Sequence, residues 1–344
     1  MIQFYKPTIR RKDMDSVLRT LVDEKIGPGE RASFFMHEFA QTTGCRSAAA
    51  YRTYPECIES ALRLIGACEG TKVALSPLAP KVYLTVLNKL GCVPVYVDVD
   101  PENGLADSRA DFRGASILVL YDNCGSLALK YNSQTTFAER CVYENISVIE
   151  DVSQSIGGNY LQEFKAGDWG SVVVCSCEDE DIVSCAGGAV LGVKGDLTYT
   201  LRSSKPSSYY EMTDMNAALG SVQLANLDED SNVRRTIISL YRDSLMRTEH
   251  RQFGFVLTDF QPSGQGFAVF LNSKPEDTVA FAKKYGVPVR MTFGGSIAAS
   301  YDGDIFADFP VAGALCSRTV SFPVYPFLRK DETELTAKVI AHLP

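Results

Sequence analysis

Four consecutive acidic residues, Glu178 to Asp181, directly follow the run Cys175-Ser176-Cys177. Clustered carboxylates are the ligands that hard cations prefer, so a metal site is one hypothesis for this segment. The other is a solvated loop after a strand, with the two cysteines on one buried face of that strand. The loop interpretation is favoured because the thiols and the carboxylates are expected to point to different places. We therefore predict no metal site.

Ten cysteines are scattered along the chain, and no CxxC pair occurs. A nucleophilic role for Cys124 or Cys185 needs a neighbouring base. The three histidines, His37, His250 and His342, lie in segments that give no reason to place one beside either thiol. Most of the cysteines stand in apolar stretches, which is typical of free, buried thiols.

Short apolar runs that alternate with helical periodicity must position these residues. The expected strands are 72–75, 93–99, 117–121, 147–150, 171–177 and 188–193. Runs of this kind, separated by helices, indicate a mainly parallel sheet covered by helices on both faces. The fold class predicted from the pattern is therefore α/β.

The remaining segments suggest two domains. Met14, Val17, Leu18, Leu21 and Val22 have the spacing of a single helical stripe, and we expect that stripe to be buried. Residues 195–210 are polar and are expected to form a long loop. A smaller α/β unit is expected near the end of the chain, with strands at 267–271 and 287–292 and helices after Pro275 and over 330–342. We predict a large domain over 1–245, including the N-terminal helix, and a small domain over 246–344.

Composition excludes several classes of protein. Apolar residues make up 45% and charged residues 22% of the 344, as in a globular protein, and the net charge is -8. An acidic chain without a cluster of basic and aromatic residues is not expected to bind nucleic acid. No apolar run approaches the roughly 20 residues needed to cross a membrane, and the first residues do not look like a signal peptide. We expect a cytoplasmic protein.

Six segments, in order, carry a resemblance to a known family. They are IGPGERASFFMHEFAQTTG, VPVYVDVDPENG, VIEDVSQSIGG, the run AGDWGSVVVCSC with the later AGGAVL, MTDMNAALGSVQLANLDE and FPVAGALCSRTVSFPVYPFL. Together they resemble the DegT/DnrJ/EryC1/StrS aminotransferases, which use pyridoxal phosphate (PLP) to modify keto-sugars attached to nucleotides. The resemblance implies the aspartate-aminotransferase fold (PLP fold type I), a dimer, and a cofactor at the carboxyl ends of the strands.

Two cofactor contacts of the family are retained. Asp151 stands where the family keeps the carboxylate that pairs with the pyridinium nitrogen, so that the ring can act as an electron sink. Gln154 matches the residue that commonly contacts the ring hydroxyl. The alternative for Asp151 is a cap for the loop that follows a strand.

The lysine that anchors the cofactor is missing. In the family it lies between residues matching Ser176 and Gly187-Gly188, but no lysine or histidine occurs in that interval here. Counting from either end places Glu180 or Asp181 at its position. A carboxylate cannot form the imine with which transamination begins.

The phosphate site is also altered. The family's Ser-Gly-Thr at a helix N-terminus aligns with Thr53-Tyr54-Pro55, where proline removes a donor and tyrosine adds bulk. Ser176 and Thr53 are the phosphate contacts that the resemblance leaves in place. Other contacts of the family align with Pro80, Asp122 and Tyr209.

Three hypotheses about function follow. The first is a homologue that does not transaminate and that binds nucleotide-sugars or serves as a partner subunit, either with itself or with an active paralogue, in amino-sugar or surface-polysaccharide biosynthesis. The second is an active aminotransferase or dehydratase that holds PLP or its amine form, pyridoxamine phosphate, without a covalent bond, with Glu180 or Asp181 as general base. The third is a structural or regulatory protein. Sequence alone does not say whether the chain is an enzyme.

Overall fold

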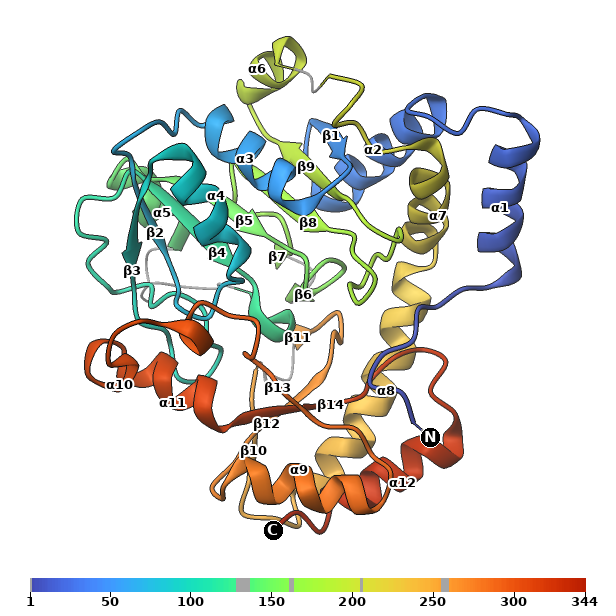
Figure 1. Ribbon diagram of the computed structural model, residues 1–344, viewed down its shortest axis with the longest axis vertical. Coiled ribbons are helices and arrows are strands. Elements are labelled where there is room, and N and C mark those ends of the chain that lie inside the picture. The colour runs from blue at the N-terminus through green and yellow to red at the C-terminus, as the bar shows by residue number, and fades with distance from the viewer. Residues whose placement is uncertain (1, 128–136, 161–163, 205–206, 255–259) are drawn as a thin grey trace.

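The computed structural model describes residues 2–127, 137–160, 164–204, 207–254 and 260–344. Its largest element is a seven-stranded sheet (Figure 1). The strands lie in the order β1 (Ser47–Tyr51), β9 (Ala189–Val193), β8 (Val172–Ser176), β5 (Ser147–Asp151), β4 (Ile117–Tyr121), β2 (Lys72–Leu75) and β3 (Val93–Tyr96). Only the pairings of β9 with β1 and β8 are antiparallel. The predicted mainly parallel sheet is confirmed, although the sequence pattern missed β1.

Helices cover both faces of this sheet. One face packs against α3 (Tyr54–Leu64), α4 (Val82–Leu90) and α6 (Leu197–Ser203), and the other against α2 (Glu30–Thr43), α5 (Phe137–Tyr143) and α7 (Asp214–Ala225). Every residue of β4, β8 and β9 is buried, as expected for the inner strands of a sheet covered on both faces. Within the described ranges, no helix has both the length and the apolarity needed to cross a membrane.

The chain after α8 (Leu227–Leu245) forms most of a second core. The long helix α8 runs from the large sheet toward this core (Figure 1). Its four strands are antiparallel, in the order β10 (Arg251–Gln252), β12 (Phe267–Phe270), β14 (Thr319–Phe322) and β13 (Arg290–Met291). They pack against α8, α9 (Pro275–Lys284) and α12 (Lys330–Ile340). Ile2 belongs to this core, so the first residues lie against the C-terminal unit.

The remaining elements are short. A three-stranded sheet has the order β11 (Phe260–Gln261), β6 (Asn159–Tyr160) and β7 (Phe164–Lys165). The helices α10 (Ile305–Asp308) and α11 (Pro310–Arg318) precede β14, and 3-10 turns occur at Asn123–Gly125 and Ala298–Ser300. The prediction that 195–210 is a loop was wrong in part, because α6 occupies its first half; residues 205 and 206 lie outside the described ranges.

The apolar stripe of the first helix, α1 (Arg11–Val22), was expected to be buried, and this prediction was wrong. Four of its apolar residues are exposed: Met14 (57%), Leu18 (57%), Leu21 (46%) and Val22 (74%). The buried side of α1 is polar instead, and it is bonded to α7. Asp13 accepts a hydrogen bond from Gln223 Nε2 at 2.7 Å, and Ser16 Oγ donates to the carbonyl oxygen of Ala218 at 3.0 Å. Periodicity shows which side chains share a face, but not which face the chain itself covers.

Candidate functional site

Asp151 is the last residue of β5, at the carboxyl edge of the large sheet, and it has no exposed surface. Its Oδ1 atom accepts hydrogen bonds from the Ser153 backbone N at 3.0 Å and from Ser153 Oγ at 2.5 Å. Its Oδ2 atom accepts one from Tyr83 Oη at 2.5 Å and another from Tyr54 Oη. An ionised carboxylate has about four acceptor positions. All of them are used by the protein.

The two phenols come from helices on the same face of the sheet. Tyr54 begins α3 and Tyr83 lies in the first turn of α4, and their rings meet edge to face with centroids 6.2 Å apart. Burial raises the pKa of both phenols well above the usual value, so they remain neutral donors. Burial also raises the pKa of Asp151, and the hydrogen bonds from Ser153 and the two tyrosines oppose that shift. Sequence reasoning noted the bulk of Tyr54 but missed Tyr83; a tyrosine in an apolar stripe was the available signal, because a buried hydroxyl needs a partner.

Thr53 is the N-cap of α3 and is exposed. Its Oγ1 accepts a hydrogen bond from the Glu56 backbone N at 3.4 Å and donates one to Glu56 Oε2 at 2.9 Å. A helix N-terminus attracts anions because its first N–H groups are unpaired. Here the carboxylate of Glu56, in the first turn, already supplies that negative charge.

Glu180 connects the two cores. Its Oε1 and Oε2 atoms lie 2.9 and 2.8 Å from Arg290 NH1, which belongs to β13 of the small sheet. The backbone oxygen of Glu180 accepts a hydrogen bond from Gln265 Nε2 at 2.9 Å. Arg290 in turn stacks on the ring of Phe4 at 4.3 Å. One of the two residues counted to the lysine position therefore forms an ion pair across the gap between the large sheet and the small one, which the sequence pattern does not reveal.

Asp181 follows Glu180 in the acidic loop and is partly buried. Its Oδ2 atom accepts a hydrogen bond from the Glu178 backbone N at 2.9 Å, and Tyr5 Oη donates to its backbone oxygen at 3.2 Å. Burial is the main cause that raises the pKa of Asp181 to about 7, and a hydrogen bond with Ser176 opposes it. Ser176 is itself buried, and its backbone N donates to Ser153 Oγ at 2.8 Å. Ser176 is thereby linked through Ser153 to Asp151.

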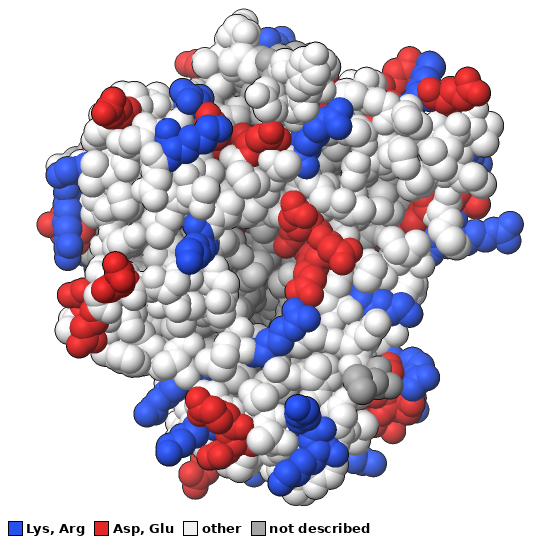
Figure 2. Space-filling view, in the orientation of Figure 1, with Lys and Arg blue, Asp and Glu red and all other residues white. Residues whose placement is uncertain are grey.

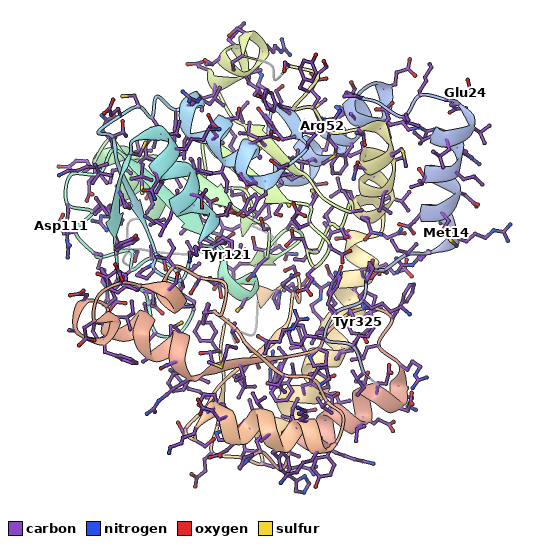
Figure 3. All side chains as sticks on the ribbon, viewed as in Figure 1. Met14, Glu24, Arg52, Asp111, Tyr121 and Tyr325 are labelled. Atoms are coloured by element: carbon purple, nitrogen blue, oxygen red, sulfur yellow. The ribbon has the colours of Figure 1, made fainter. Side chains whose placement is uncertain are left out.

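A cleft of about 640 Å³ separates the two cores. Gln154, Glu180 and Asp181 line its large-domain side, whereas Arg290 and Gln265 line the other. Gln154 also borders a smaller pocket of about 170 Å³ together with Pro80 and Tyr121. Tyr121 lies near the centre of the molecule in the view of Figure 3. Figure 2 shows acidic side chains gathered beside a hollow in the middle of the viewed face. Three of the predicted site residues thus share the cleft, whereas Asp151 and Ser176 are buried beneath it and Thr53 is exposed.

Other aligned positions play different roles. Asp122 is fully buried, and burial raises the pKa of its carboxyl well above the usual value. Its Oδ2 accepts a hydrogen bond from Ser155 Oγ at 2.7 Å, and its Oδ1 has no hydrogen-bond partner among the described residues. Tyr209 is 83% exposed. All ten cysteines are free thiols, as predicted.

Replacing Asp181 with asparagine is expected to change how stability depends on pH. The folded-state pKa of about 7 lies above the value in the unfolded chain, so the stabilising contribution of Asp181 is full below the unfolded pKa and is lost as pH rises through 7. Asp181→Asn should therefore be more stable than wild type at pH 8, by on the order of 1–2 kcal/mol, and nearly equal to it at about pH 4. Urea unfolding at a series of pH values tests this, with the exposed Asp179→Asn as the matched control. Parallel wild-type and Asp181→Asn profiles would contradict it.

Known proteins of similar sequence and fold show what the chain resembles. The profile of the DegT/DnrJ/EryC1/StrS aminotransferase family matches residues 135–343. The Bacillus subtilis (strain 168) spore coat polysaccharide biosynthesis protein SpsC is 23% identical, over 95% of this chain and 93% of its own length. A DegT DnrJ EryC1 StrS aminotransferase from Brucella abortus superposes with a TM-score of 0.86 at 19% identity, covering 99% and 98% of the two chains. The E. coli GDP-4-keto-6-deoxy-D-mannose-3-dehydratase with bound hydrated PLP gives 0.83 at 14%, covering 98% of each. The expected aspartate-aminotransferase fold is confirmed.

Proposed function

The chain belongs to the DegT/DnrJ/EryC1/StrS aminotransferase family, and we propose that it does not carry out ordinary transamination. We propose instead that it acts as a nucleotide-sugar-binding or partner subunit in the synthesis of amino sugars or surface polysaccharide. The polysaccharide setting is supported by the similarity to the B. subtilis spore coat protein.

The observation that carries this proposal is the state of Glu180. Transamination starts with an imine between a lysine and the cofactor aldehyde, and a carboxylate has no nitrogen with which to form it. Both oxygens of Glu180 contact Arg290, and its carbonyl oxygen is bonded to Gln265. The same chemical limit applies to Asp181, the other residue counted to this position, so an acid stands there by either count, and Glu180 forms an ion pair that joins the two cores.

The cleft is nevertheless suited to a polar ligand. Its walls contain hydroxyl and amide groups that can bond sugar hydroxyls, including Tyr5, Gln154, Gln265, Thr292 and Ser321. Ligand sites in α/β proteins lie at the carboxyl ends of the strands, where this cleft is found. We therefore assign the sugar ligand to this cleft.

Filling the cleft tests the assignment. Gly266 lines it, and a Cβ atom added there meets no atom of the described ranges within 4 Å. Gly266→Leu should therefore weaken binding of UDP-glucose or dTDP-glucose by about ten-fold or more in calorimetric titration. Gly27→Leu is the matched control, since Gly27 is equally open but lies away from the cleft. An absence of binding to wild type would remove the ligand proposal, and amino transfer from glutamate to a keto-sugar nucleotide would remove the proposal that transamination is lost.

The alternative is an active aminotransferase or dehydratase that holds its cofactor without a covalent bond. One observation favours it: the pKa of about 7 for Asp181, which lines the cleft. A group with a pKa near the working pH is suited to move protons as a general acid or base. This alternative requires that the chain bind pyridoxamine phosphate.

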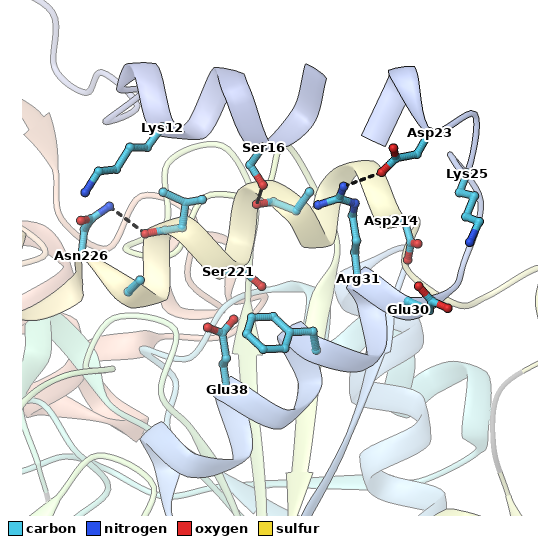
Figure 4. A pocket seen from close by; sticks show the side chains of 14 residues that line it. Lys12, Ser16, Asp23, Lys25, Glu30, Arg31, Glu38, Asp214, Ser221 and Asn226 are labelled. Carbon is cyan, nitrogen blue, oxygen red and sulfur yellow. Dashed lines mark hydrogen bonds and ion pairs between the residues drawn. The ribbon is translucent and has the colours of Figure 1, made fainter. Parts of the chain in front are cut away.

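The partner proposal is supported by the outer surface of α1. On its other side, α1 borders a groove of about 880 Å³ that runs between α1, α2 and α7 (Figure 4). Phe34 of α2, which is 57% exposed, lines this groove. The groove has charges of both signs, from Lys12, Lys25 and Arg31 and from Asp23, Glu30 and Glu38. An exposed apolar stripe on α1 and a nearby groove of mixed charge suit contact with a second chain of the same fold, either a copy or an active paralogue.

Introducing charge on this surface is expected to prevent assembly. Leu18→Glu combined with Leu21→Glu puts two carboxylates in the apolar stripe of α1, so the protein should become monomeric with little loss of helix. Sedimentation velocity of wild type and variant measures this, with Met246→Glu as the control, since Met246 is also an exposed apolar residue but lies at the end of α8. If the double variant assembles as wild type does, the interface lies elsewhere.

A further inference from the structure

Asp151 stands where the family keeps the carboxylate that holds the cofactor ring, but here it is bonded to side chains of this chain. A pyridinium nitrogen needs a free carboxylate oxygen and space for a flat ring beside it. Asp151 offers neither, because its four acceptor positions are taken by Ser153, Tyr54 and Tyr83. We propose that Tyr54 and Tyr83 have taken the place of the cofactor ring on Asp151, so that the chain closes its own cofactor pocket.

Burial supports this replacement. Tyr83 has no exposed surface, Tyr54 is 9% exposed, and Asp151 between them is fully enclosed. The two rings are in edge-to-face contact, and both are fixed by helices that pack on the large sheet. A pyridine ring could reach Asp151 only if Tyr54 swung away, which would break its hydrogen bond to the carboxylate. The space and the hydrogen bonds are thus lost together.

The hydrogen bonds also explain why Asp151 persists without the lysine. A buried carboxylate is unfavourable unless donors surround it. Two neutral phenols and Ser153 supply donors on every side, so the ion remains satisfied without a cationic ring. Asp151 then serves to hold α3 and α4 against β5.

At the position of the cofactor phosphate, groups of this chain again occupy the hydrogen-bonding site. The Thr53 hydroxyl donates a hydrogen bond to the Glu56 carboxylate, which lies at the N-terminus of α3, and accepts one from the Glu56 backbone N. A phosphate dianion there would meet a negative charge where the family presents free N–H groups. Both ends of the cofactor are therefore replaced by side chains of this chain.

This inference deepens the proposed function and rests on its family assignment, but not on the sugar ligand or the partner. It predicts that wild type does not bind pyridoxamine phosphate. The alternative function requires that it does. The amine form is the suitable probe because it cannot react nonspecifically with surface lysines. Binding of a nucleotide-sugar is measured separately, so either result can fail without the other.

Titration of pyridoxamine phosphate followed by its fluorescence anisotropy tests the proposal. Wild type should show no saturable binding up to about 1 mM. Tyr54→Ala should bind at least about ten-fold more tightly than wild type, and adding Asp151→Asn to it should abolish the gain. Tyr51→Ala is the matched control, since Tyr51 is a buried tyrosine in the same core that bonds Ser60 instead of Asp151.

Three results would overturn the inference. Saturable binding to wild type would show an open pocket, and this measurement needs no variant to fold. A folded Tyr54→Ala that does not bind would show that the tyrosine is not what closes the pocket. Binding to Tyr54→Ala that survives Asp151→Asn would place the ligand elsewhere.

Discussion

Replacing Glu150 with alanine is expected to lower the free energy of unfolding by about 3–6 kcal/mol, because three buried N–H groups would lose their partner. Glu150 has no exposed surface. Its Oε1 accepts a hydrogen bond from the Gly167 N at 2.7 Å, and its Oε2 accepts bonds from the Trp169 N and the Gly170 N, both at 2.7 Å. Burial raises the pKa of Glu150, and these donors oppose that shift. The carboxylate thus holds the segment before β8 against β5.

Urea unfolding at pH 7 followed by circular dichroism measures this effect. Glu150→Gln should lie between wild type and Glu150→Ala, because the amide oxygen can accept the two bonds made to Oε2, whereas the NH₂ group at the other position faces the Gly167 N–H without an acceptor. Glu334→Ala on the exposed side of α12 should change stability by no more than about 0.5 kcal/mol. A loss below about 1 kcal/mol in Glu150→Ala would show that water or a shifted loop satisfies the three donors.

Neighbouring residues of β5 show how far the sequence could predict the site. Alternation along a strand places Glu150 and Asp151 on opposite faces, and the apolar run before them predicts a buried parallel strand. Both features follow from local pattern. The partners of Asp151 do not, because Tyr54 and Tyr83 lie 97 and 68 residues away in sequence. A pattern of polarity cannot say which helix brings its hydroxyl to which strand.

The same limit explains the other differences. The pair of Glu180 and Arg290 spans 110 residues, so its bond to the small sheet could not be predicted from local pattern. Residues 178–180 of the acidic loop are exposed, as expected for a solvated loop, whereas Asp181 is partly buried. The stripe of α1 was found correctly as a set of residues on one face. Its burial was wrong because the chain covers the opposite, polar face with α7. Burial by a second chain leaves the same periodic signal as burial by the chain itself.

The second large effect is expected at Asp230, which links the start of the chain to α8. Its side chain is buried and binds the guanidinium of Arg10 through both oxygens, with Oδ2 accepting from NH1 at 3.1 Å. One turn further along α8, Arg234 is 4% exposed, and its NH1 has no hydrogen-bond partner in the part of the chain that the structure describes. Burial lowers the pKa of Arg234, and the charge of Asp230 opposes this. One carboxylate therefore compensates two arginines.

Asp230→Asn keeps the shape of the side chain but removes its charge, so the buried Arg234 would lose the charge that opposes its burial, and the partly exposed Arg10 would lose its ion pair. Breaking a buried pair from one side typically costs about 3–5 kcal/mol, and we expect a loss of that size in urea unfolding. Asp228→Asn, exposed on the same helix, is the matched control and should cost no more than about 0.5 kcal/mol. Arg10 also anchors the segment whose Tyr5 lines the cleft, so Asp230→Asn should weaken ligand binding there although it touches no ligand. Equal stability of the two variants would mean that Arg10 and Arg234 reach solvent when Asp230 is neutral, and the N-terminal segment would then not depend on this pair.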